Sequence, residues 1–281
     1  MSASRVLLLT VVAMLAFAAN SLLCRIALRE TGIDAASFTT LRIASGALVL
    51  WLIVRARRGD IGRQGSWGSA AALFVYAAAF SYAYLSLPAA VGALLLFGAV
   101  QATMIGYGLV RGERFSGRQT VGLVLAAGGL LGLLLPGVSA PPLQGAVLMI
   151  VAGVAWGLYS LRGRRGGDPT ASTAGNFVRA LPFALVLSLS MLPHASLAAD
   201  GVLYALASGA LASGLGYAIW YAALPGLRAT QAATVQLSVP VIAAFGGALF
   251  LGEAITLRLV LASVAVLGGI ALVIGLRRSG S

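Results

Sequence analysis

The sequence contains no lysine, a single histidine (His194), a single cysteine (Cys24) and only seven acidic residues among 281 positions. Without lysine, the protein cannot hold a retinal Schiff base or any other lysine-linked cofactor. One histidine and one cysteine cannot supply a haem ligand pair, a zinc site or an iron–sulfur cluster. No pair of carboxylates lies within an apolar stretch, so hydrolysis by general acid–base catalysis has no obvious site. We therefore expect no cofactor, no metal and no enzymatic activity.

Charged residues make up 9% of the chain, whereas a soluble domain carries about 25%. Charge-poor stretches of roughly 18 or more residues recur along the whole length, and each is long enough to cross a bilayer as a helix. We predict ten such helices, at 6–28, 35–54, 67–86, 89–110, 119–136, 143–161, 171–192, 201–222, 230–251 and 257–276. The sequence therefore predicts an all-α membrane protein with ten transmembrane helices in one bundle.

The first apolar stretch has some features of a signal peptide, because Arg5 precedes it and residues 16–18 imitate a small-residue cleavage site. However, the stretch continues to Leu28, and residues 17–21 resemble residues 156–160. A segment with a counterpart elsewhere in the chain is structural, so we expect it to remain as the first helix.

The second half of the chain repeats the first at a shift of 140 residues. Residues 112–118 align with residues 252–258 and match at Gly, Glu, a Ser or Thr, and Arg. Two Glu and two Arg at one shift are hard to attribute to chance in a chain this poor in acidic residues. We predict two five-helix repeats, residues 1–138 and residues 141–281, and duplication in a membrane protein is typical of transporters.

Each predicted repeat has an odd number of helices, so the second repeat enters the membrane from the opposite side. The two repeats would then be related by a pseudo-two-fold axis in the membrane plane. Such inverted repeats place a substrate site near the bilayer midplane and alternate access to it by rocking one part against another.

The arginines are distributed unevenly between the two sides of the predicted bundle. The side that holds the N-terminus receives Arg5, Arg55, Arg57, Arg58, Arg63, Arg111, Arg114, Arg118, Arg162, Arg164, Arg165, Arg228, Arg277 and Arg278. The other side receives only Arg29 and Arg258. The positive-inside rule therefore predicts that both termini are cytoplasmic. We attribute the net charge of +12 to topology and to contact with anionic lipid headgroups, and we expect no nucleic-acid partner.

Two five-helix halves, with Gly-Glu, Ser or Thr, Arg and a Gly-Gly helix in succession in each, resemble the drug/metabolite transporter superfamily and its ten-helix EamA-type permeases. Within that family the chain is most similar to bacterial amino-acid exporters of the YddG type. The resemblance implies a monomer in the bacterial inner membrane that exports small neutral metabolites, among them aromatic amino acids. A nucleotide-sugar or drug carrier of the same fold remains an alternative, and a channel is an alternative of another class.

Polar and aromatic residues within the predicted helices are candidates for the wall of a substrate cavity. Tyr76 and Phe80 share one face of the third helix, whereas Tyr82 lies elsewhere on it. For the aromatic residues, packing against lipid or in an interfacial belt is the alternative. The candidates are Asn20, Tyr76, Phe80, Tyr82, Gln101, Trp156, Tyr159, Tyr217, Trp220 and Gln236.

Four charged residues are candidates for gating or for structural roles. Arg42 and Arg179 lie within the second helix of each repeat, where a charge is costly. They would latch a gate, attract a substrate carboxylate or bind helix-end carbonyls. Glu113 and Glu253 end the fourth helix of each repeat. For these two we favour an interfacial ion pair with a nearby Arg (Arg114, Arg118 or Arg258) over a gate.

Every carboxylate falls in a connection or at the end of a predicted helix, and the only deeply placed ionisable groups are arginines, which do not deprotonate. Proton-coupled carriers typically hold Asp, Glu or His inside the membrane. We therefore expect alternating access with facilitated diffusion down the substrate gradient.

The arginine distribution makes a testable prediction about topology. Cysteine labelling or reporter fusions should place Gly59 and Ser281 in the cytoplasm, and Ala140 and Asp200 on the opposite side. Finding Gly59 and Ala140 on the same side would contradict both the helix count and the inversion.

Overall fold

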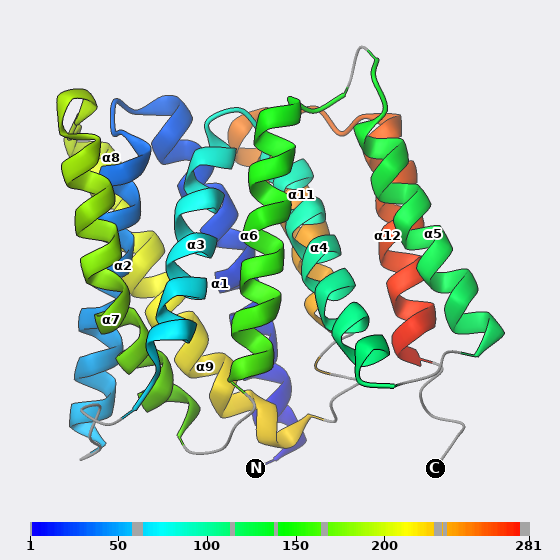
Figure 1. Cartoon of the computed structure of the whole chain (residues 1–281), viewed down its shortest axis with the longest axis horizontal. Helices are drawn as coiled ribbons and strands as arrows, with labels where there is room; N and C mark the ends of the chain where they lie inside the picture. Colours follow the sequence, from blue (N-terminus) through cyan, green and yellow to red (C-terminus); the bar gives the residue numbers. More distant parts are fainter. Residues whose placement is uncertain are drawn as a thin grey trace.

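The computed structural model describes residues 2–57, 64–112, 116–137, 140–163, 168–227, 232 and 235–275, and within these ranges all regular structure is helical (Figure 1). The helices are α1 (Ala3–Glu30), α2 (Ala35–Ala56), α3 (Trp67–Tyr84), α4 (Ala89–Val110), α5 (Gly117–Leu134), α6 (Leu143–Arg162), α7 (Pro169–Ser190), α8 (Ala199–Ala207), α9 (Gly216–Ala223), α11 (Ser238–Leu251) and α12 (Leu257–Gly275). A π-helical segment, η2 (Ser208–Leu215), joins α8 to α9, and short 3-10 turns lie at η1 (Leu192–His194) and η3 (Leu224–Gly226).

Eight helical segments of the described chain are long and apolar enough to cross a membrane. They match eight of the ten predicted helices. Helix α3 has 18 residues, and its tryptophan and three tyrosines lower its mean hydropathy below that of the eight. Helix α11 has 14 residues. The prediction of a helix at 230–251 is tested only in part, because residues 230, 231, 233 and 234 lie outside the described ranges.

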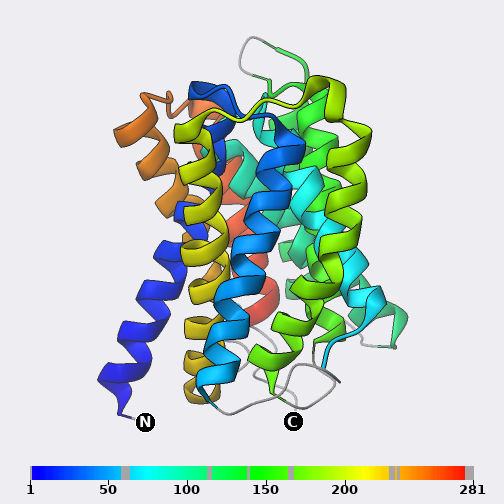
Figure 2. The ribbon, with the colours of Figure 1, turned by 90° about the vertical axis from the view of Figure 1, so that its left-hand side faces the viewer.

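The helices run up and down the bundle, with α8, η2 and α9 forming one continuous span, and consecutive spans are antiparallel (Figures 1 and 2). Helix α1 begins and α12 ends at the same end of the bundle, which we call the lower end as it is drawn in Figure 1. The opposite end, where α1 ends and α2 begins, is the upper end.

Large apolar side chains cover much of the outer surface of the bundle. Examples that are at least half exposed are Leu7, Leu8, Leu131, Leu185, Val186, Leu189, Phe245, Leu249, Phe250, Leu261 and Val264. A soluble protein rarely exposes so much contiguous apolar surface, whereas lipid tails solvate it. The apolar surface and the eight long apolar helices indicate a multi-pass membrane protein.

Asp34 begins α2 and Asp168 begins α7, so the second helix of each half has an acidic N-cap. One carboxylate oxygen of Asp34 accepts the N–H groups of Ala36 and Ser37, each at 2.9 Å. The other oxygen accepts the N–H of Ser196 at 2.9 Å, which ties the start of α2 to the connection between α7 and α8. Burial raises the pKa of the Asp34 carboxyl, but hydrogen bonds from the Ser37 side chain and from the backbone N–H groups of Ser196, Ser37 and Ala36 lower it by more, so its pKa lies below the ordinary value.

Helices α5 and α12 pack against each other through glycines that remove side chains from the contact. A Cβ atom added at Gly122 would lie 2.6 Å from the carbonyl oxygen of Gly269, and one added at Gly269 would overlap the carbonyl oxygen of Gly122. Close backbone approach of this kind replaces the hydrophobic effect as a source of helix association in lipid, because lipid tails are as apolar as the side chains.

We predict that Gly269→Ala destabilises the protein and that Gly268→Ala, at the adjacent residue, does not. A Cβ at Gly269 meets the backbone of α5, whereas a Cβ at Gly268 meets nothing within 4 Å. Overpacking costs about 1–3 kcal/mol, while Ala in place of Gly in a helix interior favours the helix by about 0.5–1 kcal/mol. Thermal unfolding of the purified variants in detergent measures both effects, and equal stability of the two variants would contradict the packing described.

Candidate functional site

A small cavity, with room for about 30 Å³ of water-sized space, lies among helices from both halves of the chain. Aromatic rings, two of them tyrosine rings with hydroxyls, make up much of its wall, together with two amides and the hydroxyl of Ser21. The lining residues are Phe17, Asn20, Ser21, Tyr76, Phe80, Leu96, Phe97, Trp156, Ala212, Tyr217 and Gln236. A mostly apolar wall with a few polar groups is typical of a small-molecule site.

Trp156 on α6 is the centre of an aromatic cluster. It stacks on Tyr159 and on Tyr217, with ring centroids 5.2 Å apart in each pair. Its centroid lies 4.8 Å from that of Tyr76, and Tyr217 in turn lies 5.7 Å from Phe17. Such contacts restrain the rings, so the cluster presents largely fixed apolar faces and π-faces to the cavity.

Six of the ten residues predicted to line a substrate cavity do line this one. They are Asn20, Tyr76, Phe80, Trp156, Tyr217 and Gln236. Tyr76 and Phe80 are four residues apart on α3 and so share its cavity-facing side. Tyr217 follows η2, and π-helical segments are rare and often occur at functional sites.

The other four predicted residues lie outside the cavity wall. Tyr82 is partly buried and two residues beyond Phe80, on a different face of α3. Gln101 and Trp220 are buried elsewhere, and Trp220 packs edge-to-face on Phe17 at 6.1 Å. Tyr159 stacks behind Trp156 and does not line the cavity.

Phe17, Ser21, Leu96, Phe97 and Ala212 line the cavity but are not among those ten candidates. The duplication carried a signal for Phe17, because the repeat of residues 17–21 in residues 156–160 makes Phe17 the counterpart of Trp156. Leu96 and Phe97 belong to an apolar membrane helix, and there an apolar residue gives no sign of whether it faces a cavity or lipid.

A polar network lies behind the cavity wall. Arg42 donates from Nη2 to the Tyr76 hydroxyl at 2.9 Å and from Nε to Ser213 Oγ at 3.4 Å. Asn20 donates to the same Tyr76 hydroxyl at 3.4 Å, and Ser208 donates to Asn20 Oδ1 at 2.7 Å. The network therefore joins α1, α2, α3 and the π-helical segment η2.

At the lower end of the bundle, the connection between α2 and α3 is bound to α7. Arg179 donates to the carbonyl oxygen of Gln64, and the N–H of Ser66 donates to Asn176 Oδ1 at 2.8 Å. Asn176 also donates to the hydroxyl of Tyr159 at 3.3 Å, which links these contacts to the aromatic cluster. Arg179, on α7, therefore binds a backbone carbonyl of the connection between α2 and α3.

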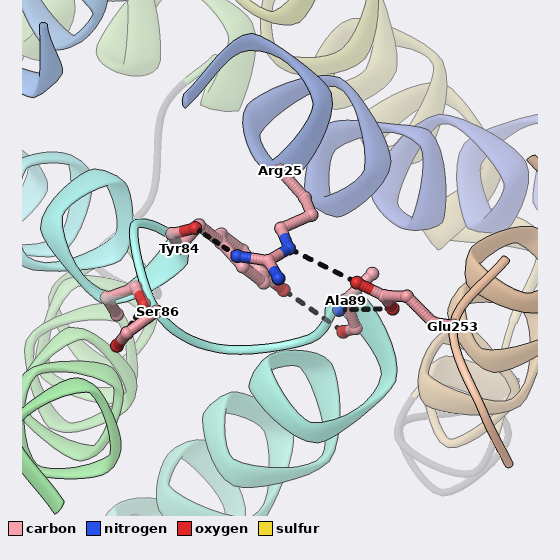
Figure 3. Close-up of polar contacts among 6 residues, drawn as sticks. Arg25, Tyr84, Ser86, Ala89 and Glu253 are labelled. Atoms are coloured by element: carbon pink, nitrogen blue, oxygen red, sulfur yellow. Dashed lines mark hydrogen bonds and ion pairs between the residues drawn. The ribbon is translucent and has the colours of Figure 1, made fainter. Parts of the chain in front are cut away.

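At the upper end, an ion pair joins the two halves of the chain (Figure 3). Arg25 donates from Nε to Glu253 Oε1 at 3.2 Å and from Nη1 to the carbonyl oxygen of Tyr84 at 3.0 Å. The other oxygen of Glu253 accepts the N–H of Ala89, the first residue of α4, at 2.8 Å. We call these four residues the upper latch, because they connect the ends of α1, α3, α4 and α11.

The expected partner of Glu253 was Arg258, and the structure corrects this. Arg258 donates instead to the carbonyl oxygen of Leu135 at 2.6 Å, and Glu253 binds Arg25. The corresponding prediction for Glu113 lies outside the described residues. Within the described ranges, no group of three His, Cys, Asp or Glu side chains is arranged to hold a metal ion.

The family model described as "EamA-like transporter family" matches residues 143–275. An uncharacterised protein of Pseudomonas aeruginosa is 63% identical over 274 residues, which are 97% of this chain and 96% of that protein. By the family match, the second half of the chain is similar to the EamA-like transporter family. This match and the transporter relatives support the drug/metabolite transporter superfamily, and they point to a transporter and not to an enzyme.

More distant relatives are named as transporters. The threonine/homoserine exporter RhtA of Salmonella typhimurium is 32% identical over 164 residues, 54% of each chain. The uncharacterised transporter YoaV of Bacillus subtilis is 27% identical over 166 residues, 56% of this chain and 57% of YoaV. A solved crystal structure shares the fold over 97% of this chain and 98% of its own, with a TM-score of 0.67 at 18% identity. That fold therefore extends over the whole of this chain, including the half that the family model leaves unmatched.

We predict that Arg25 and Glu253 are energetically coupled. Their side chains are only 12% and 15% exposed, so solvent screens the ion pair weakly. In a double-mutant cycle of Arg25→Gln and Glu253→Gln, the coupling should be on the order of 1–3 kcal/mol, read from thermal unfolding in detergent. Arg29→Gln is the matched control, because Arg29 is exposed on the same helix and should show no coupling with Glu253. Additive effects of Arg25→Gln and Glu253→Gln would contradict the latch.

Proposed function

We propose that this protein exports small neutral metabolites, in particular amino acids that include aromatic ones, across the bacterial inner membrane. The aromatic-walled cavity between the two halves carries this proposal. Its rings offer apolar contact to a side chain, and their π-faces attract an ammonium group by about 0.5–2 kcal/mol. The similarity to threonine/homoserine exporters and the resemblance to YddG-type permeases support the same substrate class.

We also propose that the two halves are inverted repeats. The described helices pair α2 with α7, α4 with α11 and α5 with α12, which are the second, fourth and fifth helices of the two halves. A two-fold axis in the membrane plane would place each of these helices antiparallel to its own counterpart, as α5 and α12 are in Figure 1. The contact of Gly122 with Gly269 also has an image at the 140-residue shift, in which Gly129 meets Ala262.

Alternating access requires that each end of the cavity can be closed separately. The upper latch supplies a closing contact between the halves at one end. The contacts of Gln64 and Ser66 with α7 supply one at the lower end. We assign these two sets of contacts as the gates, so that transport breaks one set while the other remains.

The lower end is the cytoplasmic end in this proposal. Arg5, Arg55, Arg57, Arg111 and Arg162 lie at or near the lower ends of their helices, whereas the upper end has Arg25, Arg29 and Arg258. The protein acts as a monomer, with lipid against its apolar surface and no nucleic-acid partner. Every described carboxylate lies in a connection or near a helix end, which supports facilitated diffusion without proton coupling.

The proposal predicts which aromatic residues matter for transport. Trp156→Ala and Tyr217→Ala should lower the rate of substrate counter-flow into proteoliposomes by about 2- to 30-fold, since each loses a π-face worth about 0.5–2 kcal/mol. Tyr82→Ala is the matched control and should leave the rate near that of the wild type, because Tyr82 lies outside the cavity wall.

The same proteoliposomes test the substrate class and the coupling. A panel of threonine, phenylalanine, a nucleotide sugar and a cationic dye should give counter-flow with the amino acids only. A pH gradient should leave the final distribution unchanged. Uphill accumulation that a protonophore abolishes would contradict facilitated diffusion, and flux of the nucleotide sugar or dye alone would replace the proposed substrate class.

A further inference from the structure

Arg42 is a buried cation in the membrane-spanning part of α2. Its side chain is 2% exposed, and it lies seven residues beyond the first residue of α2, about 10 Å along the helix axis. Among the described residues, its hydrogen-bond partners are two neutral hydroxyls, on Tyr76 and Ser213. Its Nη1 atom is buried and has no partner within the same ranges. A charge in this position is costly to bury and is normally kept for a function.

The cavity wall and Arg42 share two side chains. The guanidinium carbon of Arg42 lies 5.1 Å from the ring centroid of Tyr76 and 4.8 Å from that of Phe80. Both rings line the cavity, so Arg42 stands directly behind the wall that they form. The rings hold the cation in place by cation–π contact, but they supply no negative charge.

Arg179, the other predicted intramembrane arginine, is in a different situation. It binds the backbone carbonyl oxygens of Gln64 and Gly175, so polar acceptors surround it at the lower end of the bundle. A backbone carbonyl satisfies a guanidinium N–H group, whereas the Nη1 atom of Arg42 lacks such an acceptor in the described structure.

We propose that Arg42 binds the carboxylate of the transported substrate, with Nη1 as the donor. In this arrangement one carboxylate oxygen accepts from Nη1, while the Tyr76 hydroxyl keeps its contact with Nη2 and donates a hydrogen bond to the other carboxylate oxygen. The ammonium group and side chain of the substrate lie against Trp156 and Tyr217. A paired carboxylate and guanidinium form strong charge-assisted hydrogen bonds, which an uncharged amide cannot match.

This inference rests on the proposed function and narrows its substrate class. The cavity selects compounds with one carboxylate, and it discriminates against amines and amides that have the same side chain. The zwitterion of an amino acid then matches both parts of the site, with its carboxylate at Arg42 and its ammonium at the rings.

The experiment compares L-phenylalanine with L-phenylalaninamide, which differ only in the carboxylate. Binding of each compound to the purified protein is measured by tryptophan fluorescence. The fluorescence of the Trp156→Phe variant is subtracted as background, so that the difference reports on Trp156. Transport is measured by counter-flow at zero membrane potential, because the amide carries a net positive charge. Wild-type protein should bind and move the acid at least 10-fold better than the amide.

Arg42→Gln should lose this preference, chiefly by at least a 10-fold loss of affinity for the acid, and Arg42→Lys should keep part of it. Arg179→Gln, the matched intramembrane control, should leave the ratio of acid to amide unchanged even if overall flux falls. If Arg42→Gln does not fold, Arg42→Lys still tests the assignment, because a lysine that preserves the full preference contradicts a specific guanidinium contact.

The outcomes separate the two proposals. Wild-type protein that moves acid and amide equally, or an Arg42→Gln variant that keeps the wild-type preference, overturns the role of Arg42 and leaves the exporter function intact. Wild-type protein that binds and moves neither phenylalanine nor threonine overturns the exporter function, and with it the assignment of Arg42.

Discussion

The lipid interior requires each polar group of the chain to find its partner within the protein, and the remainder of the structure follows from this constraint. It explains why charged residues are scarce and why the described carboxylates lie at helix ends or in connections. It also makes each exception informative. Glu253 meets Arg25 and the start of α4, Arg179 meets carbonyl groups, and only Arg42 retains an unpartnered polar atom among the described buried side chains.

The same constraint determines how the helices associate. Apolar side chains gain little by leaving lipid for one another, so close packing and polar contacts must hold the bundle together. The glycine contact between α5 and α12 provides close packing, and the upper latch provides polar contacts between the halves. The cavity lies among α1, α3 and α4 of one half and α6, η2 and α9 of the other, where a relative movement of the halves would change access to it.

Hydropathy alone was enough to locate most of the helices, because a membrane helix must be a long apolar run. Mid-helix aromatic and amide residues were good indicators of the cavity, and Tyr76, Phe80 and Trp156 are examples. Leu96 could not be identified, since an apolar residue satisfies a lipid surface and a cavity equally well. The pairing of Arg25 with Glu253 was also out of reach: the residues are 228 positions apart, and the nearer Arg258 was the simpler choice.

The central claim is that one end of the cavity opens as the other closes. Spin-label distances test it most directly in a Cys24→Ser background, with one pair at Glu30 and Ile255 across the upper end and another at Trp67 and Val178 across the contact of the α2–α3 connection with α7 at the lower end. Addition of phenylalanine or threonine should change the two distances in opposite directions, because alternating access exchanges the two sets of gate contacts. Distances that both stay constant, or that increase together as in a channel, would contradict the account.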